Sequence, residues 1–481
     1  MSFVNAVKNQ SARTENGMLA RKSTSNSCVD LFFKIGASRG KNILPDFTAA
    51  YVQNADMATR IALWARDARG GSGERKIFRD ILGSLVDSDT DRTIAMMRKV
   101  PELGRWDDLL DSKILSNDAT RAVAFGMIQE AIMSGNGLCA KWMPRQGPVA
   151  VMLRNHFGWS PKRWRKTLVS LTKVVETKMC AKDWDNIDFN SVPSVASARY
   201  KKAFARHTPK YAEWANALVS KDPKVKETVK VNAGAVYPYD VLKGMITSVG
   251  PYSRPMPFDQ SQLNHITAQW DALPNYVGDA AILPLVDVSG SMTTHIGSNA
   301  NLTALEVAVS LGLYLADKNR GVFKDTFLTF SSSPELLHLE GNIVQKIQQM
   351  SSSTWEMSTD LHRALDRILQ VAREGNVADE DMPKMLLILS DMQFDACVSH
   401  DHSAIQMIRH KYENAGYTMP AIVFWNLNSK DNVPVSANAS GVALVSGFSP
   451  AIMKSVLSAD TDKFTPEGIM EKTVMVDRYN F

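Results

Sequence analysis

The chain has 481 residues, 44% hydrophobic and 22% charged, a length that allows two or more domains and a composition that excludes a disordered or fibrous protein. No apolar run approaches the ~20 residues of a membrane-spanning helix, and residues 1–17 lack the apolar core of a signal peptide, so we expect a cytoplasmic protein without a membrane partner. The net charge is +5, but residues 1–270 carry 40 Lys and Arg against 25 Asp and Glu, whereas residues 271–481 carry 15 against 25, so only the first portion suits a polyanionic partner.

Residues 1–265 are predicted to form an all-α domain. Apolar residues recur at helical spacing in 57–70, 76–86 and 91–100, and short breakers such as GGSGE at 70–74 divide the helices. Repeated helix–breaker–helix units favour an α-solenoid of stacked helical pairs. An ordinary helical bundle would show the same periodicity.

Two motifs in this portion are interpreted as structural. The glycine-rich stretch at 69–74 lacks the GK[ST] ending of a phosphate loop and follows a helix, so we expect a turn between helices. Arg105, Trp106, Asp107 and Asp108 are typical of a helix start with acidic residues in its first turn. We expect packing between repeats there rather than a binding site.

Residues 250–278 are rich in Pro and Gly and are predicted to be a connector with one short helix. Residues 266–481 are assigned to a second domain, in which strands alternate with helices. The predicted strands are 282–288, 325–330, 335–340, 384–392, 420–428 and 441–447, and the predicted helices are 302–319, 359–374, 403–416 and 449–459. This alternation predicts an α/β fold with a doubly wound, mostly parallel sheet, whose ligands bind at the carboxyl ends of the strands.

Oxygen-bearing side chains gather at those predicted strand ends. Asp287 ends the first strand, and Ser289 and Ser291 follow it; Thr359 opens a helix, and Asp391 ends the strand LLILSD. Carboxylate and hydroxyl oxygens suit Mg²⁺ or Mn²⁺, so the set predicts a metal site. The alternative is that Asp287 and the serines cap the helix that follows.

The DxSxS…T…D pattern of these five residues resembles the metal-ion-dependent adhesion site (MIDAS) of the von Willebrand factor A domain. The resemblance implies that Ser289, Ser291 and Thr359 bind the metal directly, and that the two aspartates bind it directly or through water. It also implies an open coordination position for an acidic residue of a partner protein. Some members of that family keep the fold but bind no ion.

Catalysis is a weaker interpretation of the same residues. Ser289 and Ser291 lie in no GxSxG elbow, and His295 has no evident acidic partner. The oxygen cluster also lacks the second metal and the general base of a hydrolase. We therefore expect no enzymatic activity, with a metal-assisted nuclease kept as an alternative.

Positive charge is densest at 151–250, which carries 18 Lys and Arg against 8 Asp and Glu. Cations interleaved with aromatics favour a nucleic-acid surface, because the cations bind phosphates and the aromatic rings stack on unpaired bases. The candidate RNA-binding residues are Lys141, Arg145, Lys162, Arg163, Arg165, Lys166, Arg199, Lys201, Lys202, Arg206 and His207. The alternative is a solvated helix face, with Trp159 and Trp164 in the core.

The order of the two domains resembles the TROVE, or Ro ribonucleoprotein autoantigen, family, in particular a poorly characterised Ro-like branch. The similar stretches are 63–82, 100–110, 141–147, 192–207, 231–242 and 424–428. The resemblance implies a ring of HEAT-like helical pairs closed by the A domain. It implies binding of small structured Y RNAs on an outer basic surface and of single-stranded ends of misfolded RNA in a central hole.

The sequence therefore predicts a non-enzymatic RNA-binding protein with a Mg²⁺ or Mn²⁺ site in its second domain. The alternative is a protein-interaction or assembly module, in which the bound metal grips an acidic residue of a partner. Both functions are compatible, because they use different domains.

Overall fold

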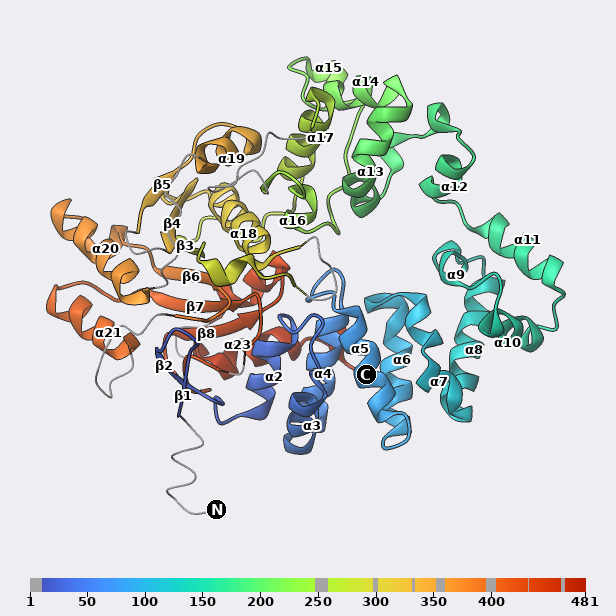
Figure 1. Ribbon diagram of the computed structural model, residues 1–481, viewed down its shortest axis with the longest axis horizontal. Helices are drawn as coiled ribbons and strands as arrows, with labels where there is room; N and C mark the ends of the chain where they lie inside the picture. Colours follow the sequence, from blue (N-terminus) through green and yellow to red (C-terminus); the bar gives the residue numbers. More distant parts are fainter. Residues whose placement is uncertain are drawn as a thin grey trace.

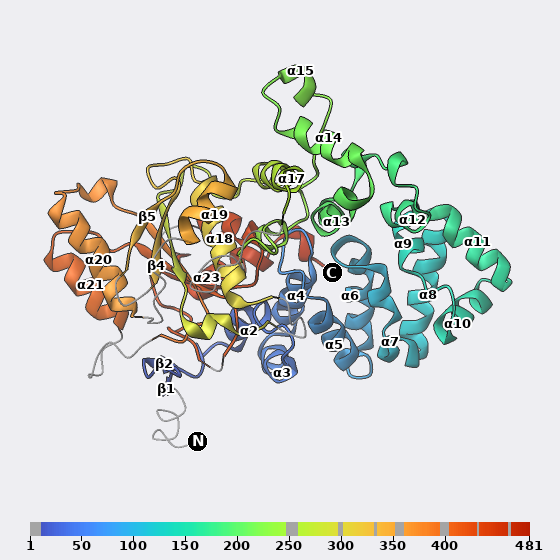
Figure 2. The same ribbon diagram turned by 45° about the horizontal axis from the view of Figure 1, so that its top comes forward.

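A computed structural model of the protein describes residues 11–246, 258–296, 302–330, 334–351, 360–394, 404–430, 432–459 and 463–481. A helical region curves away from a sheet domain and returns to it (Figures 1 and 2). In the described part of the chain, no helix is both long enough and apolar enough to cross a membrane.

From Ser27 onward the first portion is helical, as predicted, but a β-hairpin at residues 11–21 corrects the expectation that residues 1–265 are all-α. The elements of the helical region are α2 (Ser27–Ile35), α3 (Leu44–Gln53), α4 (Ala55–Arg66), α5 (Arg75–Leu85), α6 (Thr90–Leu103), η1 (Trp106–Leu110), α7 (Ser112–Ser116), α8 (Asp118–Met133), α9 (Gly137–Trp142), α10 (Pro148–His156), α11 (Pro161–Leu171), α12 (Val175–Cys180), η2 (Trp184–Asn186), η3 (Phe189–Ser191), α13 (Ser194–His207), α14 (Pro209–Leu218), α15 (Pro223–Lys226), α16 (Pro238–Val241) and α17 (Gln260–Asp271).

Local sequence sets where these helices begin. Asn26, Asn54, Asp89 and Ser160 each accept hydrogen bonds from backbone N–H groups in the first turn of the helix that follows. Consecutive helices from α2 to α6 then pack against each other. The arc is therefore built mainly from neighbours in the chain, as stacked helices require.

The far part of the arc has a small core of its own, formed by residues of η3, α13 and α14. His265 of α17 joins it from the other side: its Nε2 lies 2.8 Å from Ser197 Oγ and its Nδ1 lies 2.8 Å from Tyr211 Oη. Since α17 is one continuous helix, the boundary expected after residue 265 falls inside it.

The sheet domain confirms the predicted strand–helix alternation. Its strands lie in the order β5-β4-β3-β6-β7-β8, and only β5 is antiparallel to its neighbour. The strands are β3 (Ile282–Asp287), β4 (Thr326–Phe330), β5 (Leu336–His338), β6 (Met385–Ser390), β7 (Ala421–Asn426) and β8 (Val442–Ser446), and the predicted helices are α18 (Ala304–Lys318), α20 (Leu361–Glu374), α21 (Ala404–Asn414) and the shorter pair η7 (Pro450–Ile452) and α22 (Met453–Leu457).

Helix α18 lies unusually close to the sheet because of Gly312. A Cβ added to Gly312 would lie 2.4 Å from Val286 Cγ2, so a larger residue would push the helix away from β3. Val286 therefore points to the α18 face of the sheet. Leu283, three residues earlier on the same strand, points to the opposite face.

Three further elements were not predicted. They are the hairpin of β1 (Ser11–Arg13) and β2 (Leu19–Arg21), helix α19 (Ile343–Ser351) and helix α23 (Pro466–Val474). Helix α23 packs on β8 and on α2, so it belongs to the junction between the two regions.

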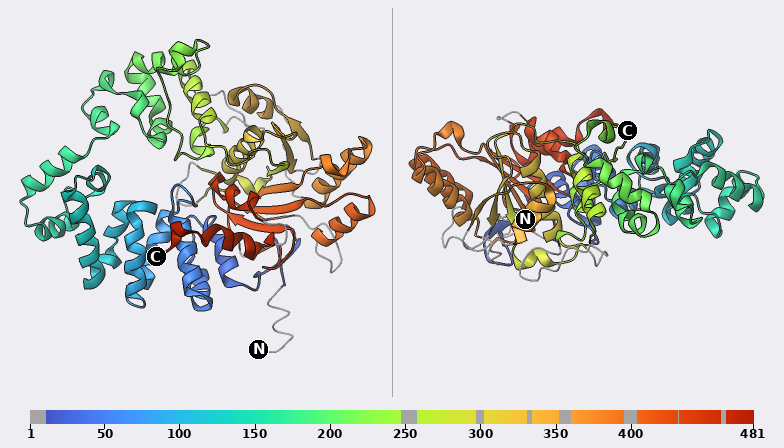
Figure 3. Two further views of the ribbon diagram at one scale, coloured as in Figure 1. Left: turned by 180° about the vertical axis from the view of Figure 1, so that it is seen from behind. Right: turned by 90° about the horizontal axis from the view of Figure 1, so that it is seen from above.

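The helical region is attached to the sheet domain at both of its ends. At its start, α2 packs on β8, and Ser446 Oγ donates a 2.8 Å hydrogen bond to the carbonyl of Phe32. At its end, α16 and α17 contact α18 and α19, and Trp270 Nε1 donates to Asp317 Oδ2 at 3.0 Å. The helices therefore form an arc closed by the sheet domain (Figure 3).

The C-terminal segment strengthens the first of these attachments. Arg478 pairs with Asp67 at the end of α4, with Nε 2.5 Å from Oδ2 and Nη2 2.9 Å from Oδ1. Tyr479 Oη donates to the same carboxylate at 3.1 Å. The C-terminus thus lies beside the blue helices of the arc (Figures 1 and 3).

Candidate functional site

The adjacency of β3 and β6 brings Asp287 and Asp391 together. The two strands are parallel and paired from Ile282 with Met385 to Val286 with Leu389, so their carboxyl ends meet at one edge of the sheet. Asp287 is the last residue of β3, Asp391 follows the last residue of β6, and both side chains are fully buried. This is the edge at which the sequence predicted a metal site.

The two serines lie between the carboxylates. Ser289 Oγ is 3.1 Å from Ser291 Oγ, and Ser291 Oγ is 3.3 Å from Asp391 Oδ1. Ligands at the ~2.0–2.1 Å distance that Mg²⁺ requires are about 3 Å apart along the edges of its octahedron. Ser291 Oγ therefore lies from Ser289 Oγ and from Asp391 Oδ1 at nearly the spacing of neighbouring ligands around a small divalent cation.

Asp391 carries an unsatisfied oxygen at this position. Its Oδ1 accepts from Ser291 Oγ, whereas its Oδ2 is buried without a hydrogen-bond partner among the described residues. A buried acceptor without a partner is costly unless a cation or a donor reaches it. Asp287 is held in place instead, since its Oδ1 accepts from Ser289 N at 2.9 Å and its Oδ2 from Ser390 Oγ at 2.6 Å.

The electrostatics of the pair also suit a cation. Burial and then the nearby charge of Asp391 raise the pKa of Asp287 to about 7, and burial raises the pKa of Asp391 as well. Two adjacent buried carboxylates repel each other when both are charged, and a bound divalent cation would remove that repulsion. No cluster of three or more His, Cys, Asp or Glu occurs in the described ranges, so a metal here would have few charged ligands.

The helix-cap alternative is wrong for these residues. Helix α18 begins after Thr303, whose hydroxyl accepts from Glu306 N at 3.2 Å, while Glu306 Oε2 accepts from Thr303 N at 2.9 Å. Ser289 precedes only the short η5 (Gly290–Thr293) and makes no side-chain cap there. Thr359, the remaining predicted ligand, lies outside the described residues.

The hairpin β1–β2 lies at the rim of the site. Thr14 Oγ1 donates to the carbonyl of Phe394 at 2.6 Å, and Glu15 N donates to Gln393 Oε1 at 2.6 Å. Gln393 N in turn donates to Asp391 Oδ1 at 3.3 Å. Sequence reasoning missed this contact, because residues nearly 380 positions apart share no local pattern.

The second candidate site is a cationic surface on the far part of the arc. We use this name for the predicted RNA-binding residues that are exposed, together with the helices that carry them. They are Arg145, Lys162, Arg163, Arg165, Lys166, Arg199, Lys202, Arg206 and His207. Lys141 is only half-exposed, with its Nζ 3.6 Å from Glu176 Oε1.

Aromatic rings lie next to several of these charges. The guanidinium of Arg163 lies 4.5 Å from the ring centroid of Trp159. The ring of His207 stacks on Trp184 with centroids 4.4 Å apart and planes 15° apart. Trp164, by contrast, is buried, which confirms the core role expected for it.

Lys201 corrects one prediction. It is only 5% exposed, and its Nζ donates to the carbonyls of Ala198 at 3.1 Å and Val241 at 3.3 Å. Burial lowers the pKa of Lys201 to about 8. Since α13 turns this residue toward α16, Lys201 supports the packing of the arc and is not a surface contact for RNA.

The motif at 105–108 is structural, as expected. Asp108 is fully buried and accepts from Arg66 Nε at 2.7 Å and from Arg79 Nε at 2.8 Å. The guanidinium of Arg105 lies 3.6 Å from the ring centroid of Trp142. These contacts join α4, α5, η1 and α9 to one another.

Comparisons with known proteins give relatives without a described activity. The family model "Domain of unknown function (DUF2828)" matches residues 154–282, and "Domain of unknown function (DUF7788)" matches residues 281–478. The chain is 28% identical over 513 residues to the uncharacterized protein L728 of Acanthamoeba polyphaga mimivirus, covering 95% of this chain and 86% of that protein.

A crystal structure of the Deinococcus radiodurans RO (RSR) protein matches with a TM-score of 0.41 and 14% identity, covering 93% of each chain. A similarity this low supports no functional argument.

Proposed function

We propose that this protein is a non-enzymatic RNA-binding protein that holds RNA on its cationic surface. The observation that carries the proposal is the group of exposed cations on helix α11. The helix exposes Lys162, Arg163, Arg165 and Lys166, and none of the four has an ion-pair partner among the described residues. Unpaired cations at this density attract phosphates.

The neighbouring aromatic pairs support single-stranded RNA as one ligand. Arg163 lies over the half-buried ring of Trp159, and His207 stacks on the half-buried ring of Trp184. An unpaired base can stack on the exposed guanidinium or imidazole next to a bound phosphate. From the resemblance of the sequence to Ro proteins, we also propose small structured RNAs as ligands. The same resemblance leads us to propose HEAT-like repeats for the arc and a von Willebrand factor A fold for the sheet domain.

Charge reversal on α11 tests this function. Fluorescence anisotropy with a labelled single strand and a labelled hairpin, as RNA and as DNA, measures affinity at low salt. We expect the combination Lys162→Glu, Arg163→Glu, Arg165→Glu and Lys166→Glu to weaken RNA binding at least about tenfold. The matched control reverses four exposed cations of residues 271–481: Lys324, Arg373, Lys463 and Lys472.

The control variant should bind RNA like the unchanged protein, because its substitutions lie outside the cationic surface. The proposal fails if the unchanged protein ignores both RNAs at low salt. It also fails if the α11 variant binds as tightly as the control variant. Tighter binding of the DNA strands than of the RNA strands would mean that the nucleic acid bound by this surface is DNA rather than RNA.

We also propose that the sheet domain binds Mg²⁺ or Mn²⁺ through Asp287, Ser289, Ser291, Thr359 and Asp391. The oxygen spacing and the unpaired Oδ2 of Asp391 support this site. Such a cation would leave an open position for an outside carboxylate, which supports a second function as a protein-interaction or assembly module.

Two experiments separate these roles. Asp287→Ala combined with Ser289→Ala should reduce binding of an acidic protein partner and leave RNA affinity unchanged, and a partner complex that resists EDTA would count against the second function. Prolonged incubation of the protein with labelled RNA and Mg²⁺ should leave the RNA intact. Cleavage that disappears in Asp391→Ala would instead establish a nuclease.

A further inference from the structure

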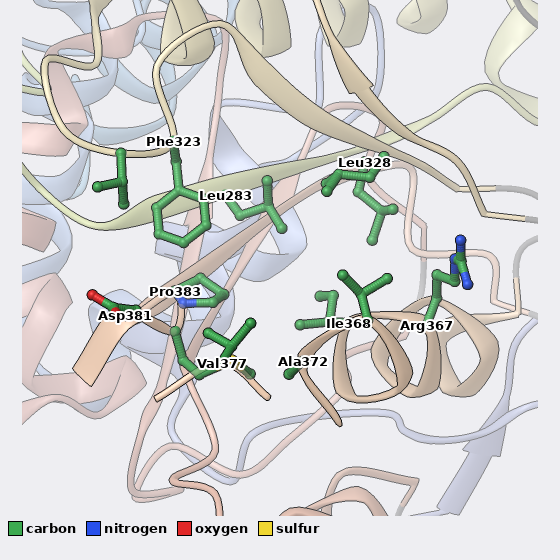
Figure 4. A pocket seen from close by; sticks show the side chains of 13 residues that line it. Leu283, Phe323, Leu328, Arg367, Ile368, Ala372, Val377, Asp381 and Pro383 are labelled. Atoms are coloured by element: carbon green, nitrogen blue, oxygen red, sulfur yellow. The ribbon is translucent and has the colours of Figure 1, made fainter. Parts of the chain in front are cut away.

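A cavity of about 280 Å³ lies on the α20 face of the sheet. Figure 4 shows the side chains that line it, which come from the strands, from α20 and from the segment before β6. Its apolar wall includes Leu283, Phe323, Leu328, Ile368, Ala372 and Val377.

This cavity is separate from the candidate metal site. Leu283 lies near the amino end of β3, four residues before Asp287, and Phe323 and Pro383 precede β4 and β6. At about 3.3 Å per residue, Leu283 lies about 13 Å from the carboxyl edge, and Leu328, which pairs with Leu285, lies about 7 Å from it. Neither Asp287 nor Asp391 lines the cavity.

The wall of the cavity is apolar and partly open to solvent. Val322 and Leu336 at its mouth are 78% and 47% exposed. Exposed aliphatic side chains next to a buried apolar wall favour an apolar occupant, because its binding removes their surface from water. The cavity volume is close to the lower end of the range, about 300–1,000 Å³, that is typical of small-molecule sites.

Opposite charges mark the two ends of the cavity. Arg367 of α20 lies at one end and Asp381 at the other (Figure 4). The guanidinium of Arg367 donates a 3.3 Å hydrogen bond to Gln370 Oε1 and has no ion-pair partner among the described residues. Asp381 belongs to the acidic turn η6 (Asp379–Asp381), so that end repels anions.

We propose that this cavity binds a small amphiphile with an apolar body and a single anionic head, such as a medium-chain fatty carboxylate. The aliphatic wall takes up the chain, and Arg367 pairs with the head group. Because an Arg–carboxylate pair is directional and charge-assisted, it fixes the orientation of the ligand. The acidic turn η6 excludes a second anionic group at the other end.

Displacement of a fluorescent dansyl-labelled undecanoate from the full-length protein tests the proposal. Laurate should displace the probe below its micellar concentration, whereas dodecylamine and the dianion dodecanedioate should compete at least about tenfold more weakly. Dodecanol, which has the apolar chain without the charge, should displace the probe less readily than laurate and more readily than dodecylamine or dodecanedioate.

Two variants locate the site without disturbing the fold. Arg367→Gln should weaken laurate binding about tenfold, about 1.4 kcal/mol, and leave dodecanol binding unchanged. Arg373→Gln, an exposed position on the same helix that does not line the cavity, is the matched control and should bind laurate normally. Val322→Asp, at an exposed position of the mouth, should weaken laurate binding as well.

The proposal is overturned if no saturable displacement occurs, or if dodecylamine competes as well as laurate. It is also overturned if Arg367→Gln and Val322→Asp bind laurate as tightly as the unchanged protein. Circular dichroism and RNA affinity should be the same in all variants, which separates this test from that of RNA binding.

Discussion

Replacing Asp391 with Asn is expected to abolish stabilisation of the sheet domain by Mg²⁺. The substitution keeps an acceptor near Ser291 Oγ but exchanges the unpaired Oδ2 for an amide, so one of the two carboxylates that face the site is lost. A ligand that binds only the folded state stabilises it by RT ln(1 + [L]/Kd), about 2.7 kcal/mol when its concentration is 100 times Kd.

For a domain of about 200 residues, each kcal/mol corresponds to roughly 2–4 °C in Tm, so saturating Mg²⁺ should raise the Tm of the sheet domain by roughly 5–10 °C. Calorimetry with Mg²⁺ and with EDTA measures this difference. In EDTA, Asp391→Asn should be at least as stable as the unchanged protein, because the substitution removes the charge that raises the pKa of Asp287.

Asp381→Asn is the matched control, since it removes an exposed acid from the opposite end of the sheet and should keep the full response to Mg²⁺. An equal rise in Tm for Asp391→Asn and for the control would refute the assignment of the metal ligands. So would an unchanged protein whose Tm is the same in Mg²⁺ and in EDTA.

Three further substitutions test how the arc is held together. Asp108→Ala leaves the buried guanidinium of Arg66 without its partner. Urea denaturation should show a free energy of unfolding that is lower by about 3–5 kcal/mol. A decrease below about 1 kcal/mol would contradict a structural role for the motif at 105–108. Burial lowers the pKa of His265 to about 3, so the unfolded state binds a proton more readily than the folded state. The free energy of unfolding therefore falls as the pH drops from about 6.5 toward 3, and it is about 2 kcal/mol lower at pH 5 than at neutral pH. Hydrogen exchange of α17, corrected for intrinsic rates, should show this loss in the unchanged protein and a flat response in His265→Gln. Arg478→Ala removes two donors from the buried carboxylate of Asp67. Urea denaturation should show a free energy of unfolding that is lower by about 1–3 kcal/mol. An unchanged denaturation midpoint would mean that the C-terminal segment does not stabilise the arc.

The sheet was largely predictable because its strands have a strong local pattern. Runs such as ILPLVD and MLLILS are short, apolar and bounded by polar residues, and they become β3 and β6. Because parallel strands end at one edge of a sheet, Asp287 and Asp391 could be placed at the same edge from the sequence. The adjacency of β3 and β6, which β4 and β5 separate in the chain, comes from the structure. The weakly apolar segments that became α19 and α23 carried too little of this pattern.

Features set by long-range packing could not be predicted. The spacing of cations on α13 gave no sign that Lys201 turns inward, because its burial depends on α16, 40 residues further along the chain. The contact of Thr14 with Phe394 depends in the same way on how the closed arc returns the N-terminal hairpin to the sheet. Charge patterns therefore identified the cationic surface as a region, whereas the structure decides which residues belong to it.

The salt dependence of RNA affinity tests the central claim most directly. If each of the four exposed cations of α11 neutralises one phosphate of a single strand, replacing all four with Gln should reduce the slope of log K against log salt concentration by about 2.8 in magnitude. The unchanged protein should therefore show a steep slope and the variant a shallow one. Equal slopes in the two proteins, or a slope near zero in the unchanged protein, would contradict RNA binding by this surface.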